Sequence, residues 1–418
     1  MVASLNDVTA TIARRDRILG IDIARALAIL GMVMVHFGPF DPDTTTTAGW
    51  IYRTSYGRAS MLFVMLAGVG VSLLFRGTHR GMPDAARRRT VAWTKVAWRA
   101  VIFLPLGLAL QMLPTPVAVI LHYYAAYYVV GGLGAMLPTG WLVTLTAGWA
   151  VIGPTAYIAL FGSALSVRGI TDNPLDVVGV VGDILVTGFY PVMTWAPAVL
   201  VGVLVGRADL RDRATQWMLV TGGTVVAAAA YGASELARSS SAAAADSPYL
   251  LAEGHSGTPL NVVGAVAVAV AVLGASLVLG SLLPRLSFPL VAVGQMALTV
   301  YTGHLLVLAV APEWLEGRSS VEDAVLQVAR FFVVTTLLCT FWRWRVNRGP
   351  LEWLLALPFE SRRGDRPLTP PARNDSWPYP TPPHNPPAST ESSTSVPRPS
   401  APPTPSSTSW SGTAPPSR

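Results

Sequence analysis

The sequence predicts an all-α membrane protein, a polytopic bundle of about ten transmembrane helices followed by a disordered C-terminal tail. Three observations support this fold class. Hydrophobic residues make up 51% of the 418 residues, and the mean hydropathy is +0.46. Charged residues make up only 13%, whereas soluble globular proteins contain about a quarter. Apolar runs of about twenty residues, enough for a helix to cross a bilayer, recur along the chain.

Ten apolar runs are expected to form the spanning helices. They lie at about 19–38, 57–75, 91–112, 116–137, 140–161, 190–206, 215–234, 259–283, 288–310 and 324–342. The short apolar stretch 176–189, which Asp183 interrupts, leaves a further helix or a re-entrant segment open. Neither an internal repeat nor a pair of broken helices is evident in the sequence.

The arginines predict which side of the membrane each loop faces, because basic residues accumulate in cytoplasmic loops. With the N-terminus inside, the cytoplasmic side receives Arg14, Arg15, Arg17, Arg76, Arg80, Arg87, Arg88, Arg89, Arg207, Arg211, Arg213, Arg285, Arg343, Arg345 and Arg348. The opposite side receives Arg53, Arg168, Arg238 and Arg318. We therefore expect a multi-pass protein of the cell membrane with both termini in the cytoplasm.

Composition divides the chain into three parts: a cytoplasmic segment 1–16, a transmembrane domain 17–358 and a tail 359–418. Residues 365–418 contain 16 of the 34 prolines together with many serines and threonines. Such a segment has too few apolar residues to form a core, so the tail is expected to be disordered. Cys339 is the only cysteine, which excludes an intramolecular disulfide.

The first apolar run contains Asp22, Arg25 and His36, although a charge at the centre of a spanning helix costs about 2.5–3.5 kcal/mol. Asp22 and Arg25 are three residues apart. Arg25 and His36 are eleven apart, which returns to within roughly 20° of the same helical face. The three side chains thus form one stripe, with Asp22 and Arg25 towards the cytoplasm and His36 towards the outside. This shared face makes the three residues the leading candidates for a functional site.

Other polar and aromatic side chains lie in or beside the expected helices, several at a similar outward depth to His36. The candidate substrate-binding residues are Arg58, His122, Tyr123, Tyr190, Trp195, His255, Gln295, Tyr301 and His304. Each also has a structural interpretation, as a hydrogen-bonded core histidine, a snorkelling arginine or part of an interfacial aromatic belt. The histidine spacings match no metal motif, so no metal is expected, and no GxSxG elbow is present. A histidine acting as general base or acyl carrier fits better.

The first-helix pattern Arg17-Ile-x-Gly-Ile-Asp-x-x-Arg-Ala-x-Ala, with His36 eleven residues after Arg25, resembles the signature of the transmembrane acyltransferase superfamily. Further segments resemble bacterial members of the heparan-alpha-glucosaminide N-acetyltransferase-like family. These segments are 58–68, 190–197, 202–210, 255–259, 294–304 and 349–353. The resemblance spans about 14–358 and excludes the tail.

The resemblance implies transfer of an acyl group, usually acetyl from acetyl-CoA, across the membrane to a sugar or glycolipid hydroxyl or amine. Arg25 and His36 occupy the positions of the family's first-helix arginine and histidine. Arg25 would stabilise the donor, His36 would take a proton from the acceptor or carry the acyl group, and Asp22 would orient Arg25. The motif around the animal enzyme's outward-facing catalytic histidine is absent, so acceptor identity does not transfer.

Two functions of other classes remain alternatives at this stage. Intramembrane charges and glycines also suit a transporter or flippase for an envelope precursor. A scaffold or sensor could use the Pro-rich tail as its output. The expected partners are membrane lipids, the acyl donor and an envelope glycan or glycolipid; nucleic acid is not expected, and homo-oligomerisation is left open.

Overall fold

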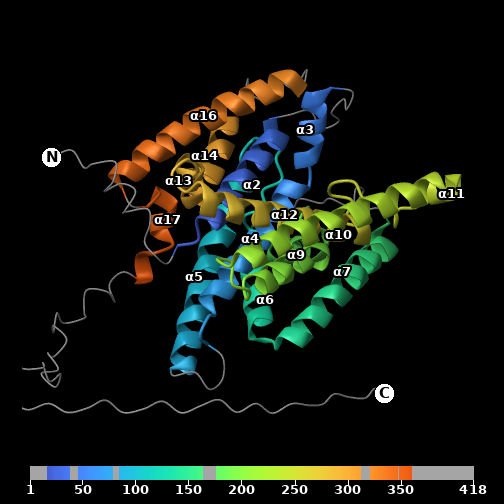
Figure 1. The fold of residues 1–418 in the computed structure, drawn as a ribbon, viewed down its shortest axis with the longest axis horizontal. Coiled ribbons are helices and arrows are strands. Elements are labelled where there is room, and N and C mark those ends of the chain that lie inside the picture. The colour runs from blue at the N-terminus through green and yellow to red at the C-terminus, as the bar shows by residue number, and fades with distance from the viewer. Residues whose placement is uncertain are drawn as a thin grey trace, which may run out of the picture. The chain divides into compact units, whose positions relative to one another are not determined.

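A computed structural model describes residues 17–37, 46–78, 84–162, 176–311, 321–346 and 348–359. The segment 1–16 and the predicted disordered tail lie outside the described residues, apart from Phe359. Within the described ranges the chain forms helices and no strand, which confirms the all-α class (Figure 1).

The longer helices are α2 (Leu19–Phe37), α4 (Arg58–Leu74), α5 (Ala85–Gln111), α6 (Tyr123–Met136), α7 (Thr139–Phe161), α9 (Val192–Val205), α10 (Arg213–Ser239), α12 (Pro259–Leu282), α14 (Ala297–Val310) and α16 (Val321–Arg345). Shorter helices connect or extend them. They are α3 (Thr47–Ser55), α8 (Val177–Gly182), the π-helical turn η1 (Asp183–Thr187), α11 (Ala242–Ala245), α13 (Phe288–Gln295), α17 (Pro350–Leu354) and the 3₁₀ turn η2 (Leu357–Phe359).

Seven described helices are long and apolar enough to cross a membrane, which supports a multi-pass protein. Two bent pairs raise the number to at most nine: Val177–Thr187 with α9, bent by 64°, and α13 with α14, bent by 77°. The predicted span 116–137 does not form one long helix. Only α6 is helical there, and its 14 residues extend about 21 Å, less than the roughly 30 Å hydrocarbon core. The expectation of no paired broken helices was also wrong.

The non-helical stretch before α6 is largely buried from Val117 onwards, and side chains satisfy its backbone there. Pro114 and Pro116 disfavour helix here because proline lacks an N–H and restricts the residue before it. The Gln111 amide accepts a hydrogen bond from Val119 N at 2.8 Å and donates one to Val117 O at 3.4 Å. Ile120 N donates to the Tyr301 hydroxyl at 3.1 Å. Irregular backbone at membrane depth requires such partners, and these bonds fix the stretch against α14.

Helix α2 lies inside the bundle, in contact with α4, α12, α13 and α16 (Figure 1). Twelve of its nineteen residues are buried. A Cβ added at Gly294 of α13 would collide with the backbone carbonyl of Asp22, so α13 approaches α2 at backbone distance. Helix α2 is therefore a central element of the structure, and its polar stripe faces protein.

Helices α4 and α9 cross through two glycines. A Cβ at Gly68 would collide with Val199 O, and a Cβ at Gly202 would collide with Met65 O. Small residues at such positions let membrane helices approach closely. The glycines of these two helices therefore serve close helix packing.

Replacing Gly202 by alanine is expected to destabilise the protein by about 1–3 kcal/mol, because the added methyl group forces the two backbones apart. Thermal unfolding in detergent should show a lower Tm. Gly222→Ala on α10 is the matched control, since a Cβ there meets no atom within 4 Å. Equal Tm values for the two variants would contradict the packing assignment.

Candidate active site

The N-terminal end of α2 carries a buried carboxylate between two guanidinium groups. Asp22 Oδ2 lies 2.6 Å from Arg17 Nε, and Asp22 Oδ1 lies 3.0 Å from Arg25 Nη1. Gln295 Nε2 donates to Asp22 Oδ2 at 3.4 Å. Burial alone would lower the pKa of Arg17, but the Asp22 carboxylate raises it, so Arg17 remains charged. The structure thus confirms the predicted Asp22–Arg25 pair and adds Arg17 and Gln295 to it.

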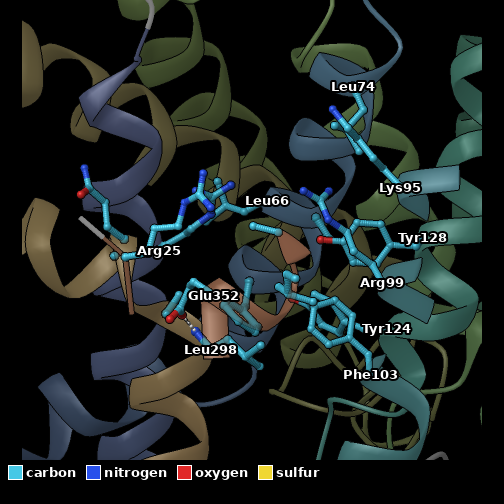
Figure 2. A pocket seen from close by; sticks show the side chains of 18 of the residues that line it. Arg25, Leu66, Leu74, Lys95, Arg99, Phe103, Tyr124, Tyr128, Leu298 and Glu352 are labelled. Atoms are coloured by element: carbon cyan, nitrogen blue, oxygen red, sulfur yellow. Dashed lines mark hydrogen bonds between the residues drawn. The ribbon is translucent and has the colours of Figure 1, made fainter. Parts of the chain in front are cut away.

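A cavity of about 410 Å³ lies beside this cluster (Figure 2). Six cationic side chains line it, and Glu352 is the one carboxylate among its described lining residues. The cations are Arg17, Arg25, Lys95, Arg99, Arg343 and Arg348. Two of them are held by aromatic rings: Arg99 over Tyr128 at 5.3 Å and Lys95 over Phe359 at 5.5 Å. This excess of positive charge suits a ligand with several negative charges.

The remaining wall of the cavity is apolar and aromatic. Its residues include Phe63, Leu66, Ala67, Phe103, Leu121 and Tyr124. Figure 2 shows Arg25 on one side of the cavity, with Phe103, Tyr124 and Tyr128 on the other. The lining therefore offers charged groups for an anionic head and apolar surface for a less polar arm.

Two histidines that are 268 residues apart in the sequence meet near the C-terminal end of α2. His36 Nδ1 lies 2.9 Å from His304 Nε2, and the two rings stack with centroids 5.2 Å apart. His304 is fully buried, whereas His36 is half-buried. In the neutral pair one nitrogen donates and the other accepts, so each ring fixes the orientation of the other.

Tyr301 connects the histidine pair to the cavity wall. Its ring centroid lies 5.1 Å from that of His304 and 6.0 Å from that of Phe63, which lines the cavity. Arg25 and His36 are eleven residues apart, about 16 Å along the axis of α2. The structure therefore brings together the predicted residues His36, Tyr301 and His304, with one aromatic layer between them and the cavity.

A second group of predicted residues forms an aromatic cluster around His255. The centroids of Tyr190 and Trp195 lie 5.8 and 6.0 Å from that of His255, and Tyr56 and Phe189 lie 5.0 and 5.1 Å away. His255 has a φ of 62°, an uncommon left-handed conformation for a non-glycine residue. Such conformations gather at functional sites, which makes this cluster a candidate for the acceptor region.

The structure places the remaining candidates beside or outside these clusters. The Tyr123 hydroxyl accepts a hydrogen bond from Phe189 N at 3.0 Å, and the Tyr123 ring stands 4.2 Å from His122. Arg58 instead contacts α10, where Nε donates to the Tyr231 hydroxyl at 2.9 Å. Its guanidinium lies 4.7 Å from the centre of the same ring. The contacts of Arg58 thus indicate a role in packing α4 against α10.

Sequence reasoning missed most of the cavity's charged lining. Arg343 and Arg348 were predicted only as cytoplasmic flanks, and Arg17 only as a flank and as the start of the first-helix pattern; the positive-inside rule is enough to explain basic flanks. Lys95 and Arg99 are one helical turn apart and inside an expected span, and this spacing could have marked them as a pair. Among the described residues no three His, Cys, Asp or Glu side chains gather as metal ligands would.

Comparison with known families divides the chain into two overlapping parts. A family model described as "Heparan-alpha-glucosaminide N-acetyltransferase, catalytic" matches residues 17–237, more than half of the chain. A second, described as "Protein of unknown function (DUF418)", matches residues 205–356. No curated protein matches the sequence. His36 belongs to the first match and His304 to the second, so the histidine pair joins the two.

Proposed function

The chain belongs to the family of the heparan-alpha-glucosaminide N-acetyltransferase catalytic domain, and from this premise we propose that it is an integral-membrane acyltransferase. It transfers an acyl group, expected to be acetyl, from acyl-CoA to a sugar or glycolipid hydroxyl or amine on the opposite side of the membrane. One observation carries the proposal: α2 joins a polycationic cavity at Arg25 to a histidine pair about 16 Å away.

The donor occupies the cavity. Acetyl-CoA carries its phosphates at one end of a long arm and its thioester at the other. The phosphates contact the cations of α2, α5 and α16, while the arm lies along Phe63 and Leu66. The apolar wall extends to Phe63, whose ring lies beside Tyr301, so the thioester has to pass this aromatic layer to reach the histidine pair while the nucleotide stays at the arginines.

His36 is the general base. It takes the proton from the acceptor hydroxyl or amine, the acceptor atom forms a bond to the thioester carbonyl carbon, and the carbon–sulfur bond breaks. The CoA thiolate leaves and receives the proton. His304, 2.9 Å from His36, accepts a hydrogen bond from the His36 imidazolium while it carries the proton. The same ring nitrogens also allow a two-step route in which His36 carries the acyl group before the acceptor attacks.

The expected orientation places the cavity on the cytoplasmic side, where acyl-CoA is made, with both termini on that side of the cell membrane. An even number of crossings is then required. The seven long helices and the two bent pairs give nine. We assign the tenth crossing to α6 together with the non-helical stretch 112–122, whose buried backbone from residue 117 onwards is satisfied by Gln111 and Tyr301.

Transport of an envelope precursor is the second candidate, and the two bent helix pairs favour it. Broken helices with satisfied termini are typical of substrate sites in transporters. The His36–His304 pair supports transport less well than acyl transfer, because the pair can accept and donate a proton but does not form a wide polar passage for a substrate. The aromatic cluster around His255 would serve an acceptor sugar in the first function and a transported sugar in the second.

The function is tested by comparing envelope acylation in a strain that lacks the gene with the same strain complemented by the wild-type gene. Mass spectrometry of envelope glycans and glycolipids should show acetyl groups that are lost on deletion and restored by complementation. A transporter would give a different result: the whole envelope molecule, acylated or not, would be depleted. Unchanged acylation after deletion contradicts the enzymatic proposal.

A further inference from the structure

A single carboxylate holds the start of helix α14 at the break in the bent pair. Glu352 of α17 accepts hydrogen bonds from Leu298 N at 2.7 Å and from Thr299 N at 3.0 Å. The Thr299 hydroxyl donates to the second Glu352 oxygen at 2.6 Å and accepts from Leu351 N at 3.2 Å. Four hydrogen bonds therefore join α17 to the first turn of α14, which we call the Glu352 clamp.

The break makes this clamp necessary. The first amides of a helix have no partner within the helix, and a 77° bend prevents α13 from continuing into α14. A carboxylate there satisfies two amides and interacts favourably with the positive end of the helix dipole. Gly349 allows α17 to take this position, since a Cβ at Gly349 would collide with Glu352 Oε2.

The clamped helix is the one that carries Tyr301 and His304. His304 follows Leu298 by six residues, about 9 Å along the axis of α14. A rotation or shift of α14 at the break would move the His304 ring relative to His36, which is held on a different helix. The 2.9 Å contact between the two rings therefore depends on where α14 begins.

We propose that Glu352 is a positioning residue for acyl transfer: through the first turn of α14 it holds His304 against His36. This inference rests on the proposed function. Glu352 also lines the cavity among six cations, where its negative charge opposes binding of an anionic donor. If Glu352 acts by positioning, its removal lowers kcat without raising the KM for acetyl-CoA, whereas if Glu352 helps to bind the donor, its removal raises that KM.

Two substitutions separate the effect of the hydrogen bonds from that of the negative charge. Glu352→Ala removes both, whereas Glu352→Gln removes only the charge. The glutamine amide keeps the geometry, because its oxygen accepts from both backbone amides and its NH2 group donates to the Thr299 hydroxyl. In the full-length protein, Glu352→Ala should lower kcat about fivefold, the effect of losing a helix cap, without raising the KM for acetyl-CoA. Glu352→Gln should restore kcat to near the wild-type value. A raised KM with unchanged kcat would overturn the proposal.

Hydrogen exchange tests the clamp without relying on activity. Amides of residues 297–304 should exchange about fivefold faster in Glu352→Ala than in wild type or Glu352→Gln, while those of α10 remain unchanged. Glu235→Ala, an exposed glutamate of α10, is the matched control and should alter neither exchange nor kcat. Thr299→Val, which removes the clamp hydroxyl, should increase the exchange rate of these amides by an intermediate amount. This variant replaces Glu352→Ala in the test if the alanine variant does not fold.

The outcomes distinguish this inference from the function on which it rests. Unchanged exchange at 297–304 in Glu352→Ala and Thr299→Val overturns the clamp. Faster exchange with full kcat overturns the positioning role. If wild type transfers no acetyl group although exchange responds as expected, the proposed function fails, and the positioning role fails with it, while the structural clamp stands.

Discussion

Replacing His36 by alanine is expected to lower acyl transfer about 10²–10⁴-fold, the usual contribution of a general acid–base group. The fold should survive, since His36 is only half-buried near the C-terminal end of α2. The measurement is transfer of radiolabelled acetyl from acetyl-CoA to envelope material, with thermal unfolding as the check on folding. His384→Ala, a histidine of the C-terminal tail, is the control and should retain full activity. Equal rates for wild type and His36→Ala would exclude His36 from the mechanism.

Substitution of His304, the partner of His36, gives a second test of the histidine pair. Because the two rings are in contact, their effects should not add. His304→Ala should lower the rate less than His36→Ala, and the double variant should match His36→Ala alone. Multiplied losses in the double variant would show that the two histidines act independently.

Neutralising two cations of α5 is expected to weaken donor binding. Lys95 and Arg99 line the cavity and are held by aromatic rings, so they offer preorganised charges to the donor phosphates. A charge-assisted hydrogen bond contributes about 1.5–3 kcal/mol, so each glutamine substitution should raise the Kd for acetyl-CoA about tenfold to hundredfold. Calorimetry on the purified protein would measure this change.

The control for this prediction is Arg213→Gln, an exposed cation at the start of α10 that does not line the cavity. It should leave the Kd unchanged. The difference between the α5 variants and wild type should shrink at high salt, because added ions screen partly exposed charges. A double α5 variant that binds acetyl-CoA as tightly as wild type would place the donor elsewhere.

The sequence predicted the polar stripe of α2 because helical periodicity is local. The three-residue spacing of Asp22 and Arg25 is enough to bring their side chains together, and the ion pair is present. The contact between His304 and His36, in contrast, was not predictable from local periodicity. The depth of His304 in the membrane was predictable from topology, but its contact with His36 spans 268 residues and depends on how α14 packs against α2.

The error at 116–137 has a physical cause. Apolar composition places a segment in the bundle but does not determine whether its backbone is helical. Pro114 and Pro116 disfavour helix, and the cost of the open backbone is offset by Gln111 and Tyr301, of which Tyr301 is distant in sequence. The role of Glu352 was likewise hidden, because nothing in the local sequence shows which helix a carboxylate will cap.

In the proposed mechanism, donor and acceptor enter the site from opposite sides of the membrane. Proteoliposomes containing the purified protein test it when radiolabelled acetyl-CoA is supplied outside and envelope glycan and glycolipid extract from the deletion strain is trapped inside. We predict labelled acetyl groups on the trapped material with wild type and none with His36→Ala. Labelling only when donor and acceptor are on the same side would contradict transfer across the membrane. Equal labelling by wild type and His36→Ala would contradict the role of His36 in the transfer.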